Sequence, residues 1–174
     1  IDTVARKMNI LISSILNLSR ISRAKLSRQQ IDMSVIVRNT LGELQSLQPG
    51  RKVEADIKDG IRAVADLGLI TIALDNLIRN GWKFSSTREV TRIEFGAFNK
   101  EGETVYYVRD NGVGFDPQSA RVIFEPFKRV HDQEAFAGMG IGLSIVERVI
   151  QRHGGSIWAQ SEVGRGATFY FTLG

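Results

Sequence analysis

The stretch that decides the fold of this chain is Asp110-Asn111-Gly112-Val113-Gly114-Phe115, or D-N-G-V-G-F. The alternating run at residues 104–108 directly before it predicts a strand. Glycine reaches backbone angles closed to other residues and lets another molecule approach the main chain closely. Asp110, fixed where the strand stops, would face such a molecule as a hydrogen-bond acceptor. An ordinary turn is the alternative, because acid, Asn and Gly also cluster in turns.

Composition predicts a soluble globular domain, alone or with an appendage. The 174 residues are 43% hydrophobic and 24% charged, without an apolar run long enough for a membrane span or a signal peptide. The start at Ile1 suggests a fragment of a longer protein. The absence of cysteine excludes disulfides and thiolate metal sites, and suits the cytoplasmic location that we expect.

The histidine content and the net charge argue against three kinds of function: histidine metal binding, His-based hydrolysis and nucleic-acid binding. Two histidines argue against a histidine metal cluster or a His-based hydrolytic triad. The net charge of +4 and the pI near 9.6 would admit a nucleic-acid partner. However, the basic residues are scattered and form no run, so we predict a solvated surface and no nucleic-acid partner.

The first 29 residues differ from the rest. Apolar residues recur there at the three- and four-residue spacings of a heptad seam: Ile1, Val4, Met8, Leu11, Ile15 and Leu18. A seam this short needs a partner helix, which predicts part of a helical hairpin. Packing on its own domain is the alternative. A polar segment follows to about Gln30, so we predict two units, 1–29 and 30–174.

The order of expected strands and helices in the second unit predicts a two-layer α/β sandwich, with a mixed sheet and three helices. We expect strands near 30–33, 53–57, 61–65, 90–99, 104–108, 156–159 and 167–171. Helices are expected from an N-cap at Ser34 to Pro49, from an N-cap at Asp66 to Phe84, and over 140–152. The long irregular region from 116 to 140 predicts a lid.

The helix after Asp66 carries a polar face. Asn76, Asn80 and Lys83 recur at spacings of four and three, so they project together. Two amides and an ammonium on an otherwise apolar helix suit a hydrated Mg²⁺ with phosphate oxygens. The alternative is that these three are ordinary exposed polar residues.

Two further motifs lie within the predicted lid and at its end. Gly138-Met139-Gly140-Ile141-Gly142-Leu143 places glycines before a helix, where free N–H groups favour phosphate. It has neither the P-loop nor the Rossmann spacing. The segment Phe124-Glu125-Pro126-Phe127-Lys128-Arg129 holds two aromatics and two bases, which could also be a surface turn.

Together and in this order, the four motifs resemble the N, G1, F and G2 boxes of the GHKL superfamily, specifically the catalytic domain of sensor histidine kinases. The resemblance covers residues 31–173, and the closing G-x-G-A-T-F-Y-F at Gly164–Phe171 matches the family's last hairpin. It implies a Bergerat-type ATP-binding fold. It also implies that the first helix comes from the dimerisation and phosphoacceptor hairpin.

The resemblance implies a role for each residue of the motifs. Asp110 would accept a hydrogen bond from the adenine amino group, and Asn80 would hold Mg²⁺. Asn76 would support the same polar face and Lys83 would contact phosphate. The other residues implied in nucleotide binding are Phe84, Gly112, Gly114, Phe115, Phe124, Phe127, Arg129, Gly138, Gly140, Gly142, Leu143 and Thr168.

The implied activity is transfer of the γ-phosphoryl group of Mg-ATP to a histidine. No segment matches the family's phosphoacceptor motif, and His131 and His153 are expected to be structural. Implied partners are the phosphoacceptor domain of the same protein, a response-regulator receiver domain and a second copy in a homodimer. Any membrane contact would come through other parts of the parent chain.

Two alternatives remain. ATP-hydrolysing members of the superfamily place a glutamate one turn before the Mg²⁺-binding Asn, as general base. This chain has Asn76 there, and Asp75 is rotated about 100° away. A nucleotide sensor without catalysis is the second alternative, although the N, G1 and G2 boxes are intact.

Overall fold

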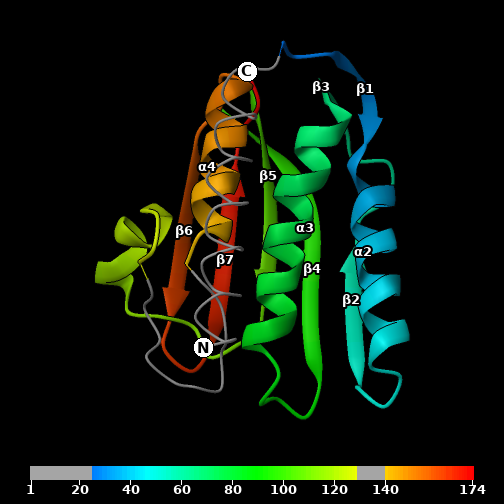
Figure 1. Ribbon diagram of the computed structural model, residues 1–174, viewed down its shortest axis with the longest axis vertical. Helices are drawn as coiled ribbons and strands as arrows, with labels where there is room; N and C mark the ends of the chain where they lie inside the picture. The colour runs from blue at the N-terminus through cyan, green and yellow to red at the C-terminus, as the bar shows by residue number, and fades with distance from the viewer. Residues whose placement is uncertain (1–24, 129–139) are drawn as a thin grey trace, which may run out of the picture.

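The computed structural model describes residues 25–128 and 140–174. The predicted first helix therefore lies outside the described residues, as do the lid residues Arg129, His131 and Gly138. In the described part, three helices cover one face of a five-stranded sheet (Figure 1). The predicted two-layer α/β sandwich is confirmed. No helix among the described residues combines the length and apolar character that a membrane crossing requires.

The elements follow the predicted order. The helices are α2 (Met33–Leu47), α3 (Leu67–Phe84) and α4 (Gly142–Arg152), with 3₁₀ turns at Pro117–Ala120 and Val122–Phe124. The strands are β1 (Arg28–Asp32), β2 (Val53–Ile57), β3 (Arg62–Asp66), β4 (Thr91–Lys100), β5 (Glu103–Asp110), β6 (Ile157–Glu162) and β7 (Gly166–Phe171).

The main sheet has the strand order β2-β4-β5-β7-β6 and is mixed. β2 and β4 are parallel, and the other neighbours are antiparallel. β1 and β3 form a separate antiparallel pair beside α2. β5 is central, so the D-N-G turn leaves the middle of the sheet.

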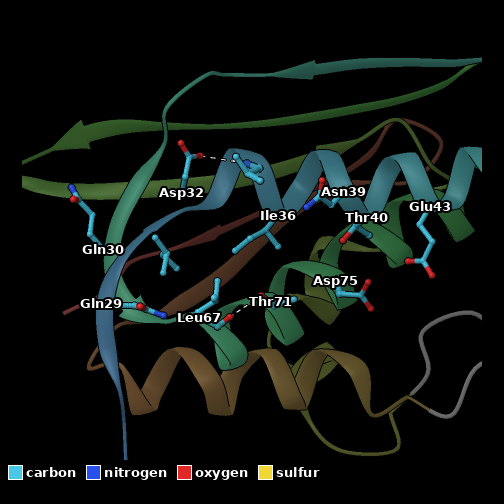
Figure 2. Close-up of a pocket in the computed structure, with 12 residues that line it drawn as sticks. Gln29, Gln30, Asp32, Ile36, Asn39, Thr40, Glu43, Leu67, Thr71 and Asp75 are labelled. Atoms are coloured by element: carbon cyan, nitrogen blue, oxygen red, sulfur yellow. Dashed lines mark hydrogen bonds between the residues drawn. The ribbon is translucent and has the colours of Figure 1, made fainter.

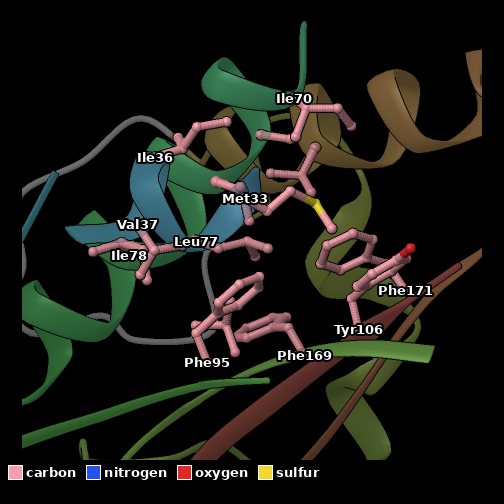
Figure 3. Close-up of a cluster of buried hydrophobic side chains, with 14 of the residues drawn as sticks. Met33, Ile36, Val37, Ile70, Leu77, Ile78, Phe95, Tyr106, Phe169 and Phe171 are labelled. Carbon is pink, nitrogen blue, oxygen red and sulfur yellow. The ribbon is translucent and has the colours of Figure 1, made fainter. Parts of the chain in front are cut away.

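The core lies between the sheet and the helices (Figure 3). Ile70, Leu77 and Ile78 of α3 lie against Phe95 of β4 and Phe171 of β7, all at most 1% exposed. Full burial stabilises each such side chain by roughly 1.5–3 kcal/mol. This packing fixes the rotation of α3, and therefore the direction of its polar face.

The start of α2 corrects one prediction. The N-cap is Asp32, whose Oδ1 accepts from the N–H groups of Ser34 at 3.0 Å and Val35 at 3.3 Å. Ser34 is fully buried, and its hydroxyl donates to the Lys58 carbonyl and accepts from the Ile61 amide. Ser34 therefore fastens the connection between β2 and β3 instead of capping the helix.

The predicted N-cap of α3 is confirmed and joins a buried junction. Asp66 Oδ1 accepts from the Leu69 N–H at 3.1 Å. The Asp66 N–H donates to Nε2 of His153, whose Nδ1 contacts the Val149 carbonyl at 2.7 Å. A ring that accepts at Nε2 and meets a carbonyl at Nδ1 is neutral, with its proton on Nδ1. His153 is fully buried at this junction, which agrees with a structural role.

The face of the main sheet opposite the helices carries an aromatic row. Trp158 stacks on Tyr170 with ring centroids 5.6 Å apart, and Tyr107 lies 6.4 Å from Tyr170. Phe98 extends the row to β4 and is 43% exposed. Tyr170 follows Phe169, which points into the core, and successive strand residues alternate between faces. The row is thus separated from the helices by the thickness of the sheet.

Candidate functional site

Asp110, the last residue of β5, is buried at 6% exposure. Its Oδ1 accepts from the Gly112 N–H at 2.8 Å. Burial raises the pKa of the Asp110 carboxyl to about 6, although hydrogen bonds from the Gly112 and Ala167 amides oppose the shift. The group is thus a partly dehydrated acceptor held in one orientation.

The end of α3 packs directly against this carboxylate. A Cβ on Gly81 would lie 3.2 Å from the Cβ of Asp110. A Cβ on Gly112 would lie 2.9 Å from the Phe84 carbonyl, which accepts from the Val113 N–H at 3.1 Å. α3 and the D-N-G turn therefore form one wall. The glycine after Asn80, which costs helix propensity of about 1 kcal/mol, fits this tight contact.

The predicted polar face of α3 is present. Asn76, Asn80 and Lys83 are all partly exposed along the helix. Nδ2 of Asn76 donates to the Ile72 carbonyl at 2.8 Å. Its Oδ1 lies 2.7 Å from where a Cβ on Gly142 would be, so it faces the start of α4. Lys83 Nζ lies 4.4 Å from the centroid of the Phe84 ring.

The start of α4 has the features of an anion site. No side chain among the described residues caps the helix, and its N-cap residue is Ile141. The first N–H groups and the positive end of the helix dipole are therefore available to an anion. Leu143 packs against the core beneath this turn. The polar face of α3 thus meets the start of α4.

The described segments on either side of residues 129–139 are joined by a backbone hydrogen bond. The Phe127 N–H donates to the Gly140 carbonyl at 2.8 Å. Gly140 has φ +69°, and a Cβ there would lie 2.5 Å from the Lys128 carbonyl oxygen, so glycine is required. Phe127 also has a positive φ of 66° and is 53% exposed. A non-glycine residue in this conformation is uncommon and marks a constrained backbone.

Two aromatic residues of the predicted binding set belong to the core. Phe115 and Phe124 are 8% and 6% exposed and pack on Phe169, with centroid distances of 6.4 and 6.5 Å. Phe124 was expected in the mobile lid, but it is buried and holds the 3₁₀ turn at Val122–Phe124 against Phe169 of β7. Gly114 contacts the last hairpin, because a Cβ there would meet the Glu162 carbonyl.

The structure places Thr168 away from the site. Ala167 pairs with Asp110 in the β5–β7 register, while Thr168 pairs with Arg109. Neighbouring strand residues point to opposite faces, so Thr168 lies on the face without helices, where Arg109 Nε donates to its hydroxyl. The prediction of a nucleotide contact by Thr168 is wrong by one residue of register.

A groove of about 630 Å³ lies on the other side of α3, between α2, α3 and β1 (Figure 2). Gln29, Ile36, Leu67 and Thr71 contribute to its lining. None of the residues predicted to bind nucleotide lines this groove. The candidate site is therefore the opposite edge of α3, between Asp110 and the start of α4.

The chain matches one family model over most of this architecture. The model is described as histidine kinase-, DNA gyrase B- and HSP90-like ATPase, and it matches residues 65–174. The chain belongs to this ATPase family. The match begins at β3 and includes α3, the D-N-G turn, the lid region and α4.

Two relatives are similar to nearly the whole of this chain. Methanogenesis regulatory histidine kinase FilI from Methanothrix harundinacea is 34% identical over 174 residues, which is 99% of this chain and 19% of the relative. Cyanobacterial phytochrome A from Nostoc sp. is 35% identical over 95% of this chain and 22% of its own length. The chain thus spans about a fifth of the length of these curated relatives.

Solved structures agree with the family match. Full-length ShkA in complex with AMPPNP superimposes with a TM-score of 0.73 at 28% identity, over 96% of this chain and 35% of ShkA. The mycobacterial sensor histidine kinase MprB gives 0.69 at 22% identity, over 84% of this chain and 97% of the MprB chain. The predicted resemblance to catalytic domains of sensor histidine kinases is confirmed.

Proposed function

We propose that this chain is the catalytic domain of a sensor histidine kinase, which binds Mg-ATP and transfers its γ-phosphoryl group to a histidine on a phosphoacceptor helix. The observation that carries the proposal is the approach of Asn76 on α3 to Gly142 at the uncapped start of α4. It brings an amide-rich helix face to an anion site, while Asp110, at the end of β5, lies against Gly81 farther along α3.

Asp110 is proposed to recognise the base. An adenine presents an exocyclic amino group, which donates hydrogen bonds, and an ionised carboxylate is an acceptor only. Oδ1 is already held by the Gly112 amide, so the carboxylate needs no reorientation when the base arrives. The Phe84 carbonyl lies at the same wall, and its ring is proposed to lie beside the base.

Phosphate binding is proposed for α3 and α4 together. The free N–H groups at Gly142 and Leu143 would bind phosphate oxygens. Asn80 lies one turn beyond Asn76 on the partly exposed face, and an amide oxygen suits Mg²⁺, which keeps several waters and phosphate oxygens as its other ligands. The ion would neutralise phosphate charge, and Lys83 would add a second positive charge. Gly138 and Arg129 remain predicted contacts outside the described residues.

The described residues favour phosphoryl transfer over hydrolysis. Asn76 stands where a hydrolase has its general base, and an amide cannot take a proton at neutral pH. Asp75, the nearest acid in the sequence, binds Arg79 Nε with both oxygens at 2.9 and 2.8 Å. Arg79 also contacts Glu43 of α2, which holds this group away from Asn76. Positioning and electrostatics are then the main contributions of the protein.

The partners are proposed from the same relatives. A phosphoacceptor histidine domain of the parent protein would receive the phosphoryl group, and a response-regulator receiver domain would accept it next. Residues 1–29 are proposed to belong to the dimerisation hairpin, which would make the parent protein a homodimer. We propose a cytoplasmic location for this domain.

The test measures nucleotide binding and transfer separately. Calorimetric titration of the chain with Mg-ATP should show binding, and a separately prepared phosphoacceptor hairpin should then acquire label from γ-³²P-ATP. Asn80→Ala should abolish Mg²⁺-dependent binding. Asn99→Ala is the matched control, because Asn99 Oδ1 only accepts from the Gly102 N–H in a distant hairpin turn.

The outcomes separate the three candidate activities. A chain that does not bind Mg-ATP would refute the kinase assignment. Binding with release of free phosphate but no labelled hairpin would indicate a hydrolase. Binding with neither product would indicate a nucleotide sensor.

A further inference from the structure

Arg88 lies between α3 and β4, outside the four sequence motifs, and its guanidinium donates to three backbone carbonyls. Nε donates to Asn111 at 2.8 Å, and Nη2 donates to Gly112 at 2.9 Å and to Gly164 at 2.6 Å. The first two carbonyls belong to the D-N-G turn after Asp110. The third belongs to the turn between β6 and β7.

These contacts hold the turn by its carbonyl groups, whereas Asp110 holds it by the Gly112 amide. Two consecutive carbonyls, of Asn111 and Gly112, converge on one cation, which offsets the repulsion between their dipoles. With these carbonyls held, the Gly112 N–H meets Oδ1 of Asp110 and the Val113 N–H meets the Phe84 carbonyl. A rigid planar donor fork can hold three acceptors at once, whereas a lysine ammonium is a single flexible point charge.

The third carbonyl brings the last hairpin into the same arrangement. The Gly164 N–H donates to the Val113 carbonyl at 2.7 Å, and the Gly164 carbonyl accepts from Arg88. The turn is therefore held between α3, the last hairpin and Arg88. The Arg88 side chain links all three segments from the connection that follows α3.

We infer that Arg88 is a positioning residue for base recognition: it holds the D-N-G turn in the conformation in which Asp110 accepts from the adenine amino group. Arg88 acts on the adenine end of the site and not on its phosphate end. This inference rests on the proposed function.

The experiment compares ligands that report the two ends of the site. Dissociation constants of adenosine, Mg-ADP and Mg-tripolyphosphate are measured for the wild-type chain, Arg88→Ala and Arg88→Lys. We expect Arg88→Ala to weaken adenosine and ADP by about tenfold or more, which corresponds to one lost stabilising contact in the bound state. Tripolyphosphate should bind within about twofold of wild type, and Arg88→Lys should be intermediate for adenosine.

A second readout follows the turn itself. Amide hydrogen exchange at Gly112 and Val113 should become faster in Arg88→Ala, while exchange in the β4–β5 ladder stays unchanged. The matched control is Arg92→Ala, because the Arg92 side chain is 63% exposed and its Nε pairs with Glu54 at 2.7 Å. That variant should leave all three dissociation constants unchanged.

Each outcome decides the inference. Equal weakening of all three ligands, or unchanged adenosine binding in both Arg88 variants, would overturn it. If Arg88→Ala does not fold, Arg88→Lys must still weaken adenosine selectively, or the inference fails. A wild-type chain that binds no adenine ligand would instead overturn the proposed function, so the two failures are distinguishable.

Discussion

At the scale of the residue, Asp110 combines burial with an expected ligand contact. Burial raises its pKa to about 6, from the ordinary 3.8, so its carboxylate is costly in the ligand-free fold. The rise of the pKa from 3.8 to about 6 corresponds to about 3 kcal/mol of free energy that favours the protonated over the ionised carboxyl in the fold. Because the folded-state pKa is raised, protonation stabilises the fold, and this contribution is lost as the pH rises through about 6.

The first prediction concerns the pH dependence of base binding. Protonation removes the carboxylate acceptor, so adenosine affinity should fall about tenfold between pH 7 and pH 5. Asp110→Asn should bind weakly at both pH values and lose this dependence. Calorimetric titration checks it, with adenosine chosen because it lacks phosphates that titrate in the same range. Equal wild-type affinities at the two pH values would contradict the role of Asp110.

The second prediction concerns the stability of the ligand-free chain. The free energy of unfolding of Asp110→Asn, relative to wild type, should increase between pH 4 and pH 7 by up to about 3 kcal/mol. The reason is that the asparagine stays neutral while Asp110 ionises at its buried position. Urea denaturation at several pH values measures this difference. A difference that is constant with pH would show that folding does not raise the pKa of Asp110.

The same scale shows what sequence reasoning could identify. The roles expected of Asp110, Asn76 and Gly142 depend on local spacing, and the structure brings these residues to one site. Arg88 was not found, because its three acceptors lie in segments distant in sequence and any isolated arginine suggests a solvated surface. The nucleotide contact predicted for Thr168 was wrong because a motif match does not show which face of the strand a residue occupies. Neighbouring strand residues point to opposite faces, so Ala167 shares the face of Asp110 and Thr168 does not.

At the scale of the element, α3 and α4 share a junction at the ends that lie away from the candidate site. His153, at the C-terminal end of α4, accepts from the Asp66 N–H at the start of α3. Arg28 donates to the carbonyls of His153 and Gly174 and adds β1 to the same junction. The two helices that form the candidate site are thus fixed relative to one another at their other ends.

The third prediction follows from this junction. His153→Ala should lower the free energy of unfolding by about 2–4 kcal/mol, because it opens a cavity and leaves the Asp66 amide without its acceptor. Urea denaturation measures the loss. His153 is fully buried, so it should also acquire no label from γ-³²P-ATP. A change below about 0.5 kcal/mol would contradict its structural role.

Element boundaries were largely predictable from hydrophobic period and capping residues. The N-cap of α3 at Asp66 and the ends of α2 and α3 were predicted correctly. The N-cap of α2 was placed at Ser34 instead of Asp32, because both residues are good caps and only the buried β2–β3 connection decides between them. Phe115 and Phe124 look like ligand contacts in the motifs, yet packing on Phe169 determines their place.

At the scale of the whole molecule, the sheet separates two functions. The helix side carries the core and the candidate site, while the opposite side carries the aromatic row of Phe98, Tyr107, Trp158 and Tyr170. Tyr170 contacts the other three rings. The row is expected to stabilise the fold without contacting nucleotide.

The fourth prediction tests this separation. Tyr170→Ala should destabilise the chain by about 2–4 kcal/mol through lost aromatic packing. It should leave the dissociation constant of Mg-ADP within about twofold at a temperature where the variant is folded. Denaturation and calorimetry give the two values. A large loss of affinity in the folded variant would show that the two faces are coupled.

The separation has a spectroscopic consequence, since the chain has only two tryptophans. Trp82 is 5% exposed on α3, with Arg51 4.3 Å from its ring centroid, two residues beyond Asn80. Trp158 stacks on Tyr170 at the opposite face. Trp82 Nε1 donates to Gln48 at the C-cap of α2, so its ring lies on the α2 side of α3. Single Trp→Phe proteins would therefore provide two intrinsic fluorophores, one where α3 packs beside α2 and the other on the outer strands. Denaturation followed at each fluorophore would then report the unfolding of the helix layer and of the outer strands separately, without any added dye.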